Sequence, residues 1–274
     1  MYQIKYETKI VAFLDVLGFK RIVINDDNSI LERYYTIIKN QLQNLQNTEG
    51  KIESFIVSDS IILITETDIS NFTSLLILIA KIQAVLGTQN IWLRGGISIG
   101  KIHFDKNSAL IVGDGLINAY LLEEKLAIFP RVLIDTKIIN HYNTSKEGMK
   151  NELNCKFNRP KEFENIFLDY IPLLAYNELY EDGHLYVTYT DYLICRILNW
   201  DNLNSGLLID SKNFLKGFKT MMYSNSEYYP KYQWICSKLK VSKSDIKFFL
   251  HTKPLIDEQK VKQFENLAKE IELL

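Results

Sequence analysis

The 274-residue chain is long enough for one large domain or two small ones, and its 47% hydrophobic and 24% charged residues are typical of a folded protein with a sizeable core. A net charge of −1 and the lack of a basic block disfavour a broad surface for nucleic acid or anionic membrane. Three cysteines without CxxC spacing and four histidines without an HxxxH pair disfavour a zinc site and predict packed thiols in a reducing compartment.

Neither the N-terminal residues nor the most apolar run predicts a membrane segment. MYQIKYETK lacks the long apolar stretch of a signal peptide. The run SLLILIAKIQAVLG (74–87) contains Lys81 and is too short to span a bilayer. We therefore expect a cytoplasmic protein whose partners include neither membrane nor nucleic acid.

Strand-like and helix-like patterns alternate along the first half of the chain. KIVAFLD (9–15) predicts a short buried strand, and a helical pattern follows Gly18 and continues from Ser29. Two strand-like runs, 52–57 and 61–65, are separated by three residues, which is hairpin spacing. The later predicted elements are an apolar-striped helix at 68–87, an alternating strand with glycines at 91–104, a helix at 115–127 and a strand at 131–135.

The order β-α-β-β-α-β, followed by α-β, predicts an α+β fold of the ferredoxin-like type, an antiparallel sheet with helices on one face. Residues 1–140 are expected to form this core. No linker precedes residues 141–274, so we expect them to form a mostly helical C-terminal extension that completes the core and is not an independent domain. Its predicted parts are a polar surface segment at 146–163, a strand at 184–193, and helices at 213–224, 229–240 and 257–274.

Asp15 and Asp59 stand out in this core. Asp is depleted in strands and costly to bury as an anion, and the predicted fold brings the end of the first strand and the tip of the hairpin to one end of the sheet. Two such carboxylates repel each other unless divalent cations such as Mg²⁺ or Mn²⁺ bind to them. The alternative is local: Asp15 would cap the following helix, and Asp59 would be a turn residue.

The segment after Asp15 offers donors for phosphate. Val16-Leu17-Gly18-Phe19 passes from a strand into a helix, where backbone N–H groups lack intrahelical partners, and Gly18 allows a ligand to come close. Acids that bind metal beside such N–H groups predict a nucleoside triphosphate site. Two metal ions there would assist an in-line displacement of pyrophosphate.

Four motifs resemble the class III nucleotide cyclases: FLDVLGF (13–19), SDSI (58–61), RGGISIG (94–100) and G-x5-AYLLEEKLA-x2-PRVLID (113–135). In the last motif, AYxLE, a later alanine and PRV resemble one branch of that class, the pyrimidine cyclases of the Pycsar anti-phage systems. Weaker agreement is found in DGHLYVTYTDYL (182–193) and around Trp234, whereas 140–165 matches nothing in the family.

The resemblance implies that Asp15 and Asp59 bind two Mn²⁺ or Mg²⁺ ions per active site. It also implies that the ribose 3′-hydroxyl attacks the α-phosphate, giving a 3′,5′-cyclic nucleotide and pyrophosphate. The active sites would form between the subunits of a homodimer, and a separate effector would bind the cyclic nucleotide as a signal in antiviral defence. The implied backbone contacts are the Val16 carbonyl on the metal and the amides of Leu17, Gly18 and Phe19 on the β- and γ-phosphates.

Two departures from the class point away from purine substrates. Purine cyclases carry an Asn and an Arg, four residues apart, on the helix after the last sheet motif, and the corresponding positions here are Ile117 and Leu121. The position that selects the purine base corresponds to Phe55, which cannot hydrogen-bond to a base edge. The sequence therefore predicts UTP or CTP as the substrate, with a slight preference for UTP. The alternatives are a conventional adenylate or guanylate cyclase and a catalytically silent cyclase-homology domain that binds nucleotide and regulates a partner.

The missing Asn/Arg pair leaves the developing charge without its usual donor. Arg94 and Arg131 are candidates for this catalytic role, because a guanidinium can bridge phosphate oxygens bidentately. Asn118 and Tyr120 are candidate contacts to the base or the ribose. The alternatives are that Arg94 pairs with a surface acid, that Arg131 caps a helix end, and that Tyr120 packs in a dimer interface.

Overall fold

The computed structural model describes residues 3–24, 28–45, 52–105, 108, 110–154, 172–176, 183–200, 211–252 and 258–274. The chain divides into two compact units, one made of Met1–Ile82 and Trp92–Thr188, the other of Gln83–Ile91 and Tyr189–Leu274. The boundary expected after residue 140 falls inside α5 (Thr136–His141), within the first unit.

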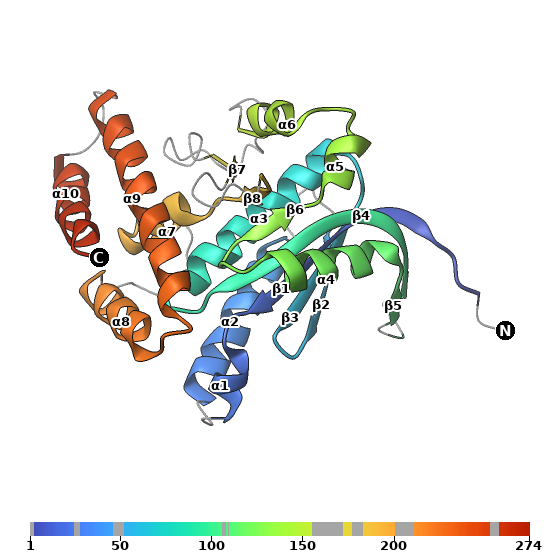
Figure 1. Cartoon of the computed structure of the whole chain (residues 1–274), viewed down its shortest axis with the longest axis horizontal. Coiled ribbons are helices and arrows are strands. Elements are labelled where there is room, and N and C mark those ends of the chain that lie inside the picture. The colour runs from blue at the N-terminus through green and yellow to red at the C-terminus, as the bar shows by residue number, and fades with distance from the viewer. Residues whose placement is uncertain are drawn as a thin grey trace. The chain divides into compact units, whose positions relative to one another are not determined.

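The first unit is built on a mixed eight-stranded sheet (Figure 1). Its strand order is β2-β3-β1-β4-β6-β8-β7, with β5 paired to β4. The β4–β6 pair is parallel and the other pairs are antiparallel. The order β2-β3-β1-β4 is that of the predicted ferredoxin-like core. The strands are β1 (Glu7–Val16), β2 (Ile52–Val57), β3 (Ser60–Thr65), β4 (Leu93–Asp105), β5 (Leu110–Val112), β6 (Val132–Ile134), β7 (Leu174–Tyr176) and β8 (Leu185–Val187).

The central strand β1 is buried on both of its faces. Ile10, Ala12 and Leu14 point to one face and are fully buried, and Val11 on the other face is fully buried as well. Figure 1 shows α3 behind the sheet and α4 across its front. Helix α3 thus covers one face of the sheet, and α4 covers part of the other face, where the prediction had helices on one face only. The helices of this unit are α1 (Phe19–Ile24), α2 (Asn28–Leu45), α3 (Ile69–Gly87, whose last residues belong to the second unit), α4 (Asp114–Leu126), α5 and α6 (Lys146–Leu153).

Helix α3 is long and apolar enough to cross a membrane by length and composition. Of its 18-residue apolar window, however, 72% is buried inside the structure. Phe72, Leu75, Leu76 and Ile79 are among its fully buried side chains. The helix therefore packs as a core helix.

Several later elements differ from the sequence predictions. The polar run that was expected to cross the surface begins with α6, because the Ser145 hydroxyl accepts a hydrogen bond from the Gly148 N–H at 2.9 Å and caps the helix. Residues 155–163 of that run lie outside the described residues. The strand expected at 184–193 is limited to β8, and a helix begins at Thr190. Sequence patterns also did not predict β5, β7 or α5.

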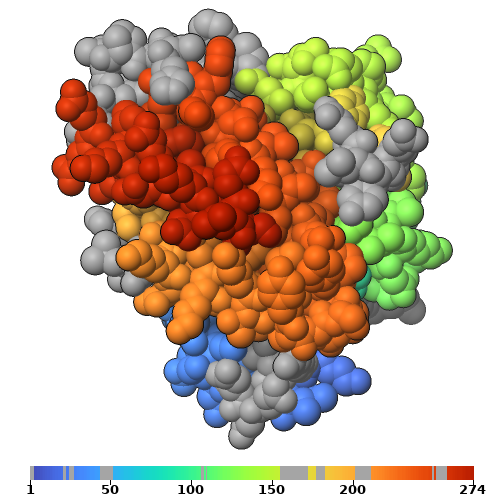
Figure 2. All heavy atoms as spheres, turned by 60° about the vertical axis from the view of Figure 1, so that its left-hand side comes forward, coloured from blue at the N-terminus to red at the C-terminus, as the bar shows by residue number. Residues whose placement is uncertain are grey.

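The second unit consists of packed helices. Figure 2 shows α8, α9 and α10 packed side by side. The ring of Phe218 on α8 lies 4.8 Å from that of Tyr232 on α9, and Lys243 of α9 forms an ion pair with Glu272 of α10. α9 is longer than the helix predicted at 229–240. The bounds are α7 (Thr190–Ile197), α8 (Ser211–Ser224), α9 (Tyr229–Thr252) and α10 (Glu258–Glu272).

A buried polar cluster joins α7 to α9 in this unit. The Thr190 and Ser242 hydroxyls are 2.6 Å apart, and Asp191 is hydrogen-bonded to Ser242. Burial, together with the nearby charge of Asp245, raises the pKa of Asp191 to about 7. The folded protein therefore holds this proton up to neutral pH, whereas the unfolded chain loses it near pH 4.

We predict that Asp191 makes the protein less stable as the pH rises from about 4 to about 7, by up to about 1.4 kcal/mol per pH unit. The sign follows because the folded state binds the extra proton across this window. Asp191→Asn should flatten the dependence and melt at a higher temperature than wild type at pH 8. Melting curves from pH 4 to pH 8 measure this, and a variant less stable than wild type at pH 8 would contradict it.

Gly96 allows α4 to lie directly on β4. A Cβ atom at this position would come within 2.4 Å of the Ala119 carbonyl oxygen and 2.8 Å of the Leu122 Cβ. We predict that Gly96→Ala lowers the free energy of unfolding by about 1–3 kcal/mol, because overpacked backbone cannot yield locally. Urea denaturation is the measurement. Gly217→Ala in α8 is the matched control, because its Cβ would meet only the end of the Asn90 side chain, and an equal loss in both variants would refute the packing argument.

Candidate active site

Strand pairing brings Asp15 and Asp59 together at one end of the sheet. Asp15 lies one residue beyond the Leu14–Ile61 pair of β1 and β3, and Asp59 lies in the turn that connects β2 to β3. Their carboxyl groups lie close enough for each to affect the ionisation of the other. Burial, followed by repulsion from Asp59, raises the pKa of Asp15 to about 6, although Arg94 acts in the opposite direction. The juxtaposition expected from the sequence is therefore present.

Two tyrosines of α2 hold the hairpin turn. The Tyr34 hydroxyl donates to the Asp59 carbonyl oxygen at 3.3 Å, and the Tyr35 hydroxyl donates to the Ser58 carbonyl oxygen at 3.0 Å. Ser58 adopts a left-handed conformation with φ 58°, a backbone state that needs such support. Burial raises the pKa of Tyr34 far above its usual value, so its hydroxyl keeps its proton and stays a donor. Helix α2 thus fixes the backbone that carries Asp59.

Arg94 lies between two carboxylates. It pairs with Asp15 across the β1–β4 ladder, and its Nε and Nη2 atoms are each 3.4 Å from the Asp15 Oδ2. Its Nε is also 2.7 Å from Oε1 of Glu123 on α4. Burial raises the pKa of Glu123 to about 7, despite the opposing effect of Arg94. The alternative from the sequence was that Arg94 pairs with a surface acid, but its partners Asp15 and Glu123 have side chains that are only 20% and 4% exposed.

The sequence motif AYxLE contains Glu123, but sequence reasoning did not predict it as a site residue. A signal was available, because Glu123 follows Ala119 at helical spacing and Gly115 precedes both on the same stripe. All three are buried in the structure. An acid on the buried stripe of a helix is unusual enough to mark a functional candidate.

The turn after Asp15 has the expected shape, but one of its backbone N–H donors is already hydrogen-bonded within the protein. Gly18 has φ +78°, a left-handed conformation that glycine adopts without strain, and α1 begins at Phe19. The Leu17 N–H donates to the Trp92 carbonyl oxygen at 2.9 Å, so this amide is engaged within the protein. Val16 is buried at the end of the β1–β4 ladder, and Phe19 packs its ring 5.9 Å from that of Tyr34.

The remaining candidates lie on neighbouring elements. Phe55 of β2 is partly buried, with its ring 4.8 Å from that of Phe104 in an edge-to-face contact. Tyr120 is 41% exposed on α4, with its ring 5.4 Å from that of Phe13. Arg131 is buried just before β6, and its carbonyl accepts a hydrogen bond from the Gly95 N–H at 3.1 Å, next to Arg94. Asn118 is partly buried on α4.

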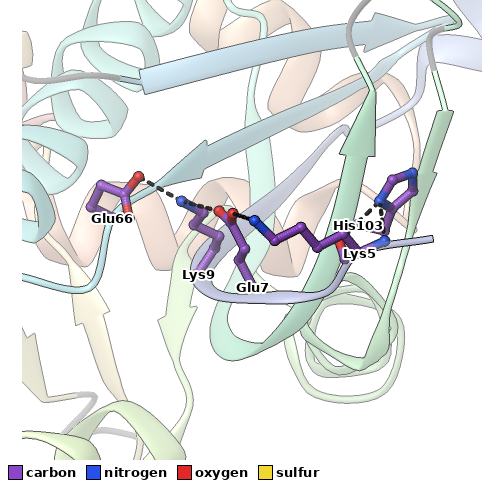
Figure 3. A network of polar contacts seen from close by, with 5 residues as sticks. All are labelled: Lys5, Glu7, Lys9, Glu66 and His103. Carbon is purple, nitrogen blue, oxygen red and sulfur yellow. Dashed lines mark hydrogen bonds and ion pairs between the residues drawn. The ribbon is translucent and has the colours of Figure 1, made fainter. Parts of the chain in front are cut away.

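A polar cavity of about 340 Å³ lies around the beginning of β1, away from Asp15 and Asp59, and Figure 3 shows some of its side chains. The Lys9 ammonium is 2.9 Å from Glu7 and 2.5 Å from Glu66, and the Lys5 backbone bonds to His103 Nδ1. Lys9 is therefore already neutralised by two acids. The carboxylates at the other end of β1 remain the stronger candidate for chemistry.

Asp15 and Asp59 fit a divalent cation by their chemistry. Within the residues that the structure describes, no group of three or more His, Cys, Asp or Glu side chains is arranged to hold a metal ion. Two carboxylates in contact still provide the hard oxygen donors that Mg²⁺ and Mn²⁺ prefer, and Mg²⁺ commonly takes its other ligands from phosphates and water.

Comparisons with known proteins give partial matches. No protein-family model matches the chain, and no curated protein does. Among solved structures, a bacterial light-regulated adenylyl cyclase matches at 15% identity and TM-score 0.37, covering 53% of this chain and 47% of that one. The adenylyl cyclase CyaB from P. aeruginosa matches at 15% identity and TM-score 0.37, covering 51% and 84%. The guanylate cyclase domain of RhGC from Catenaria anguillulae, solved in complex with GTP, matches at 17% identity and TM-score 0.32, covering 51% and 84%.

The chain therefore spans less than half the length of the light-regulated cyclase, and about half of the chain takes part in each match. At these identities and TM-scores the matches carry no conclusion about what the chain binds or does.

We predict that Asp15→Asn raises the melting temperature of the metal-free protein at pH 8, because it removes one of two repelling carboxylates. In the wild type, stability should fall as the pH rises from about 4 to about 6, since the folded pKa of Asp15 is the raised one. The variant should lose part of this dependence. Glu147→Gln, at an exposed acid of α6, is the control, and identical pH profiles for wild type and Asp15→Asn would contradict the prediction.

Proposed function

We propose that this chain is a nucleotide cyclase that converts a pyrimidine nucleoside triphosphate to its 3′,5′-cyclic nucleotide and pyrophosphate. The observation that carries the proposal is the contact between Asp15 and Asp59 at the end of β1, with Arg94 beside them. Two carboxylates held together by the sheet, next to a guanidinium, suit a substrate that arrives as a complex of metal and phosphate.

The residues divide the work. Asp15 and Asp59, with the Val16 carbonyl, would hold Mn²⁺ or Mg²⁺, which when bound would activate the attacking hydroxyl and neutralise the leaving pyrophosphate. Arg94 would donate its N–H groups to phosphate oxygens, with Arg131 as a second donor. The turn of Leu17, Gly18 and Phe19 would bring its backbone close to the β- and γ-phosphates, after the Leu17 amide leaves the Trp92 carbonyl.

The base specificity is proposed from the aromatic contact between Phe55 and Phe104. These rings offer an apolar surface and no hydrogen-bonding group to a purine edge, which favours a smaller base that stacks. UTP and CTP are the proposed substrates, and UTP is the first to test. Asn118 and Tyr120 of α4 are the proposed polar contacts to the base or the ribose.

A homodimer with active sites at the subunit interface is part of the proposal. Apolar side chains are exposed on α4 and β5: Ile117 (56%), Tyr120 (41%), Leu110 (38%) and Val112 (37%). Such a surface would be covered by a second subunit at little cost in polar desolvation.

The proposal extends to the role of the product. The cyclic nucleotide would act in the cytoplasm as a signal in antiviral defence, and a separate effector would bind it.

One observation favours a second candidate, a catalytically silent domain that binds nucleotide and regulates a partner. Arg94 contacts Asp15 where a cation would bind, and the Leu17 N–H is engaged with Trp92. A site held permanently in this state would not turn over. A conventional adenylate or guanylate cyclase is the third candidate, disfavoured by Phe55 and by Ile117.

We predict that the purified protein with Mn²⁺ forms a cyclic pyrimidine nucleotide from one member of a panel of ATP, GTP, CTP and UTP. Asp59→Ala should lower kcat/KM on the order of 100-fold or more, since charge stabilisation by a bound metal is worth several kcal/mol. Mass spectrometry of the products is the measurement. Glu147→Gln, at an exposed acid of α6, is the control for effects of mutation and purification, and it should keep the wild-type activity.

A cyclic purine as the main product would replace the pyrimidine assignment with the conventional cyclase. Nucleotide binding without any product would establish the regulatory domain.

A further inference from the structure

Arg94 has two acceptors, and only one of them is aligned with its N–H groups. The Nε–H and an Nη2–H are aimed at the Asp15 Oδ2, in long hydrogen bonds of 3.4 Å. The Glu123 Oε1 is much closer to Nε, at 2.7 Å, yet among the described residues it has no aligned hydrogen-bond donor. A small turn of the guanidinium would therefore exchange a long bond to Asp15 for a short bond to Glu123.

Burying the Glu123 carboxylate costs free energy. Its side chain is 4% exposed, and it sits on the stripe of α4 that packs against β4 and also carries Ala119. Burial outweighs Arg94 and raises the pKa of Glu123 to about 7, so at that pH the carboxylate is not stabilised by its surroundings. A glutamine of the same shape would be less costly there. A costly buried acid beside a functional guanidinium indicates a role other than stability.

We propose that Glu123 is a positioning residue: it becomes the hydrogen-bond acceptor of Arg94 when Asp15 binds a cation. The inference rests on the proposed function above and deepens it. In the cation-free state Arg94 donates its hydrogen bonds to Asp15. When Asp15 turns its oxygens to a cation, Glu123 accepts the Nε–H of Arg94 and keeps the side chain beside the site.

The exchange fixes the direction of the guanidinium. With Nε–H donated to Glu123, both terminal nitrogens of Arg94 are left for a phosphate group, which is the bidentate arrangement that Arg supports. Of the two acids that contact Arg94, only Asp15 would remain in a variant without Glu123. Arg94 would then compete with the cation for Asp15. Glu123 thus influences two steps, the entry of the cation and the placing of the phosphate.

The test is a double-mutant cycle of Glu123→Gln and Arg94→Ala on the full chain, with Mn²⁺ alone as the probe. The free Mn²⁺ signal in electron paramagnetic resonance gives the affinity without any nucleotide. Glu123→Gln should weaken Mn²⁺ binding about 10-fold, the size expected for one hydrogen bond to a charged group. In the Arg94→Ala background the same change should have an effect of less than about twofold, because Glu123 acts through Arg94.

Melting curves separate positioning from folding. Glu123→Gln should melt at pH 8 no lower than wild type, since it removes a costly buried charge, while kcat/KM falls about 10-fold. Glu147→Gln, which makes the same change on an exposed surface, should alter neither quantity. If Glu123→Gln does not fold, Glu123→Asp is the second variant: it keeps the charge but is one methylene short, and it should weaken Mn²⁺ binding only when Arg94 is present.

An equal loss of Mn²⁺ affinity in both backgrounds would mean that Glu123 acts only through its charge, and would overturn the inference. An unchanged affinity in Glu123→Gln would also overturn it. Failure of the proposed function has a different signature: the wild type would turn over no triphosphate, while the Mn²⁺ cycle would still report whether Glu123 controls Arg94.

Discussion

The site depends on the contact between two carboxyl groups that repel each other. Asp15 and Asp59 are far apart in the sequence, and the antiparallel pairing of β1 with β3, from Ile10–Thr65 to Leu14–Ile61, forces them together. Burial and mutual repulsion show in the raised pKa of Asp15. The contact persists because the ladder and the core beneath it over-determine the backbone, so the strain is local while its support is distributed over the sheet.

Charge balance explains why this cluster suits a cationic ligand. When ionised, Asp15, Asp59 and Glu123 bring three negative charges against the single positive charge of Arg94. Arg94 contacts Asp15 and Glu123, and these two contacts differ in length and alignment. Burial raises the pKa of Asp15 to about 6 and that of Glu123 to about 7, whereas a bound divalent cation would favour the ionised forms.

The sequence predicted the parts of this arrangement that depend on short-range pattern. Alternation and glycine spacing gave β1 to β4 and their order, and Asp15 and Asp59 were recognised because acids in strand-like runs are rare. Helix α6 was missed because its residues are mostly polar and only the Ser145 cap marks its start. The three-residue strands β5 and β7 carry no periodic signal of their own, since pairing with longer strands defines them.

Glu123 shows the limit of sequence reasoning at the site itself. Its spacing from Ala119 places it on the buried stripe of α4, but the sequence does not say what it would meet there. That depends on how closely the helix approaches β4, and Gly96 and Gly100 set this distance: a Cβ on either would meet α4 within 3 Å. The glycines of RGGISIG thus act through packing, because they let α4 come down far enough for a buried acid to reach Arg94. The orientation of the Arg94 guanidinium at the end of the sheet then depends on β4 having glycine, with no side chain, at positions 96 and 100.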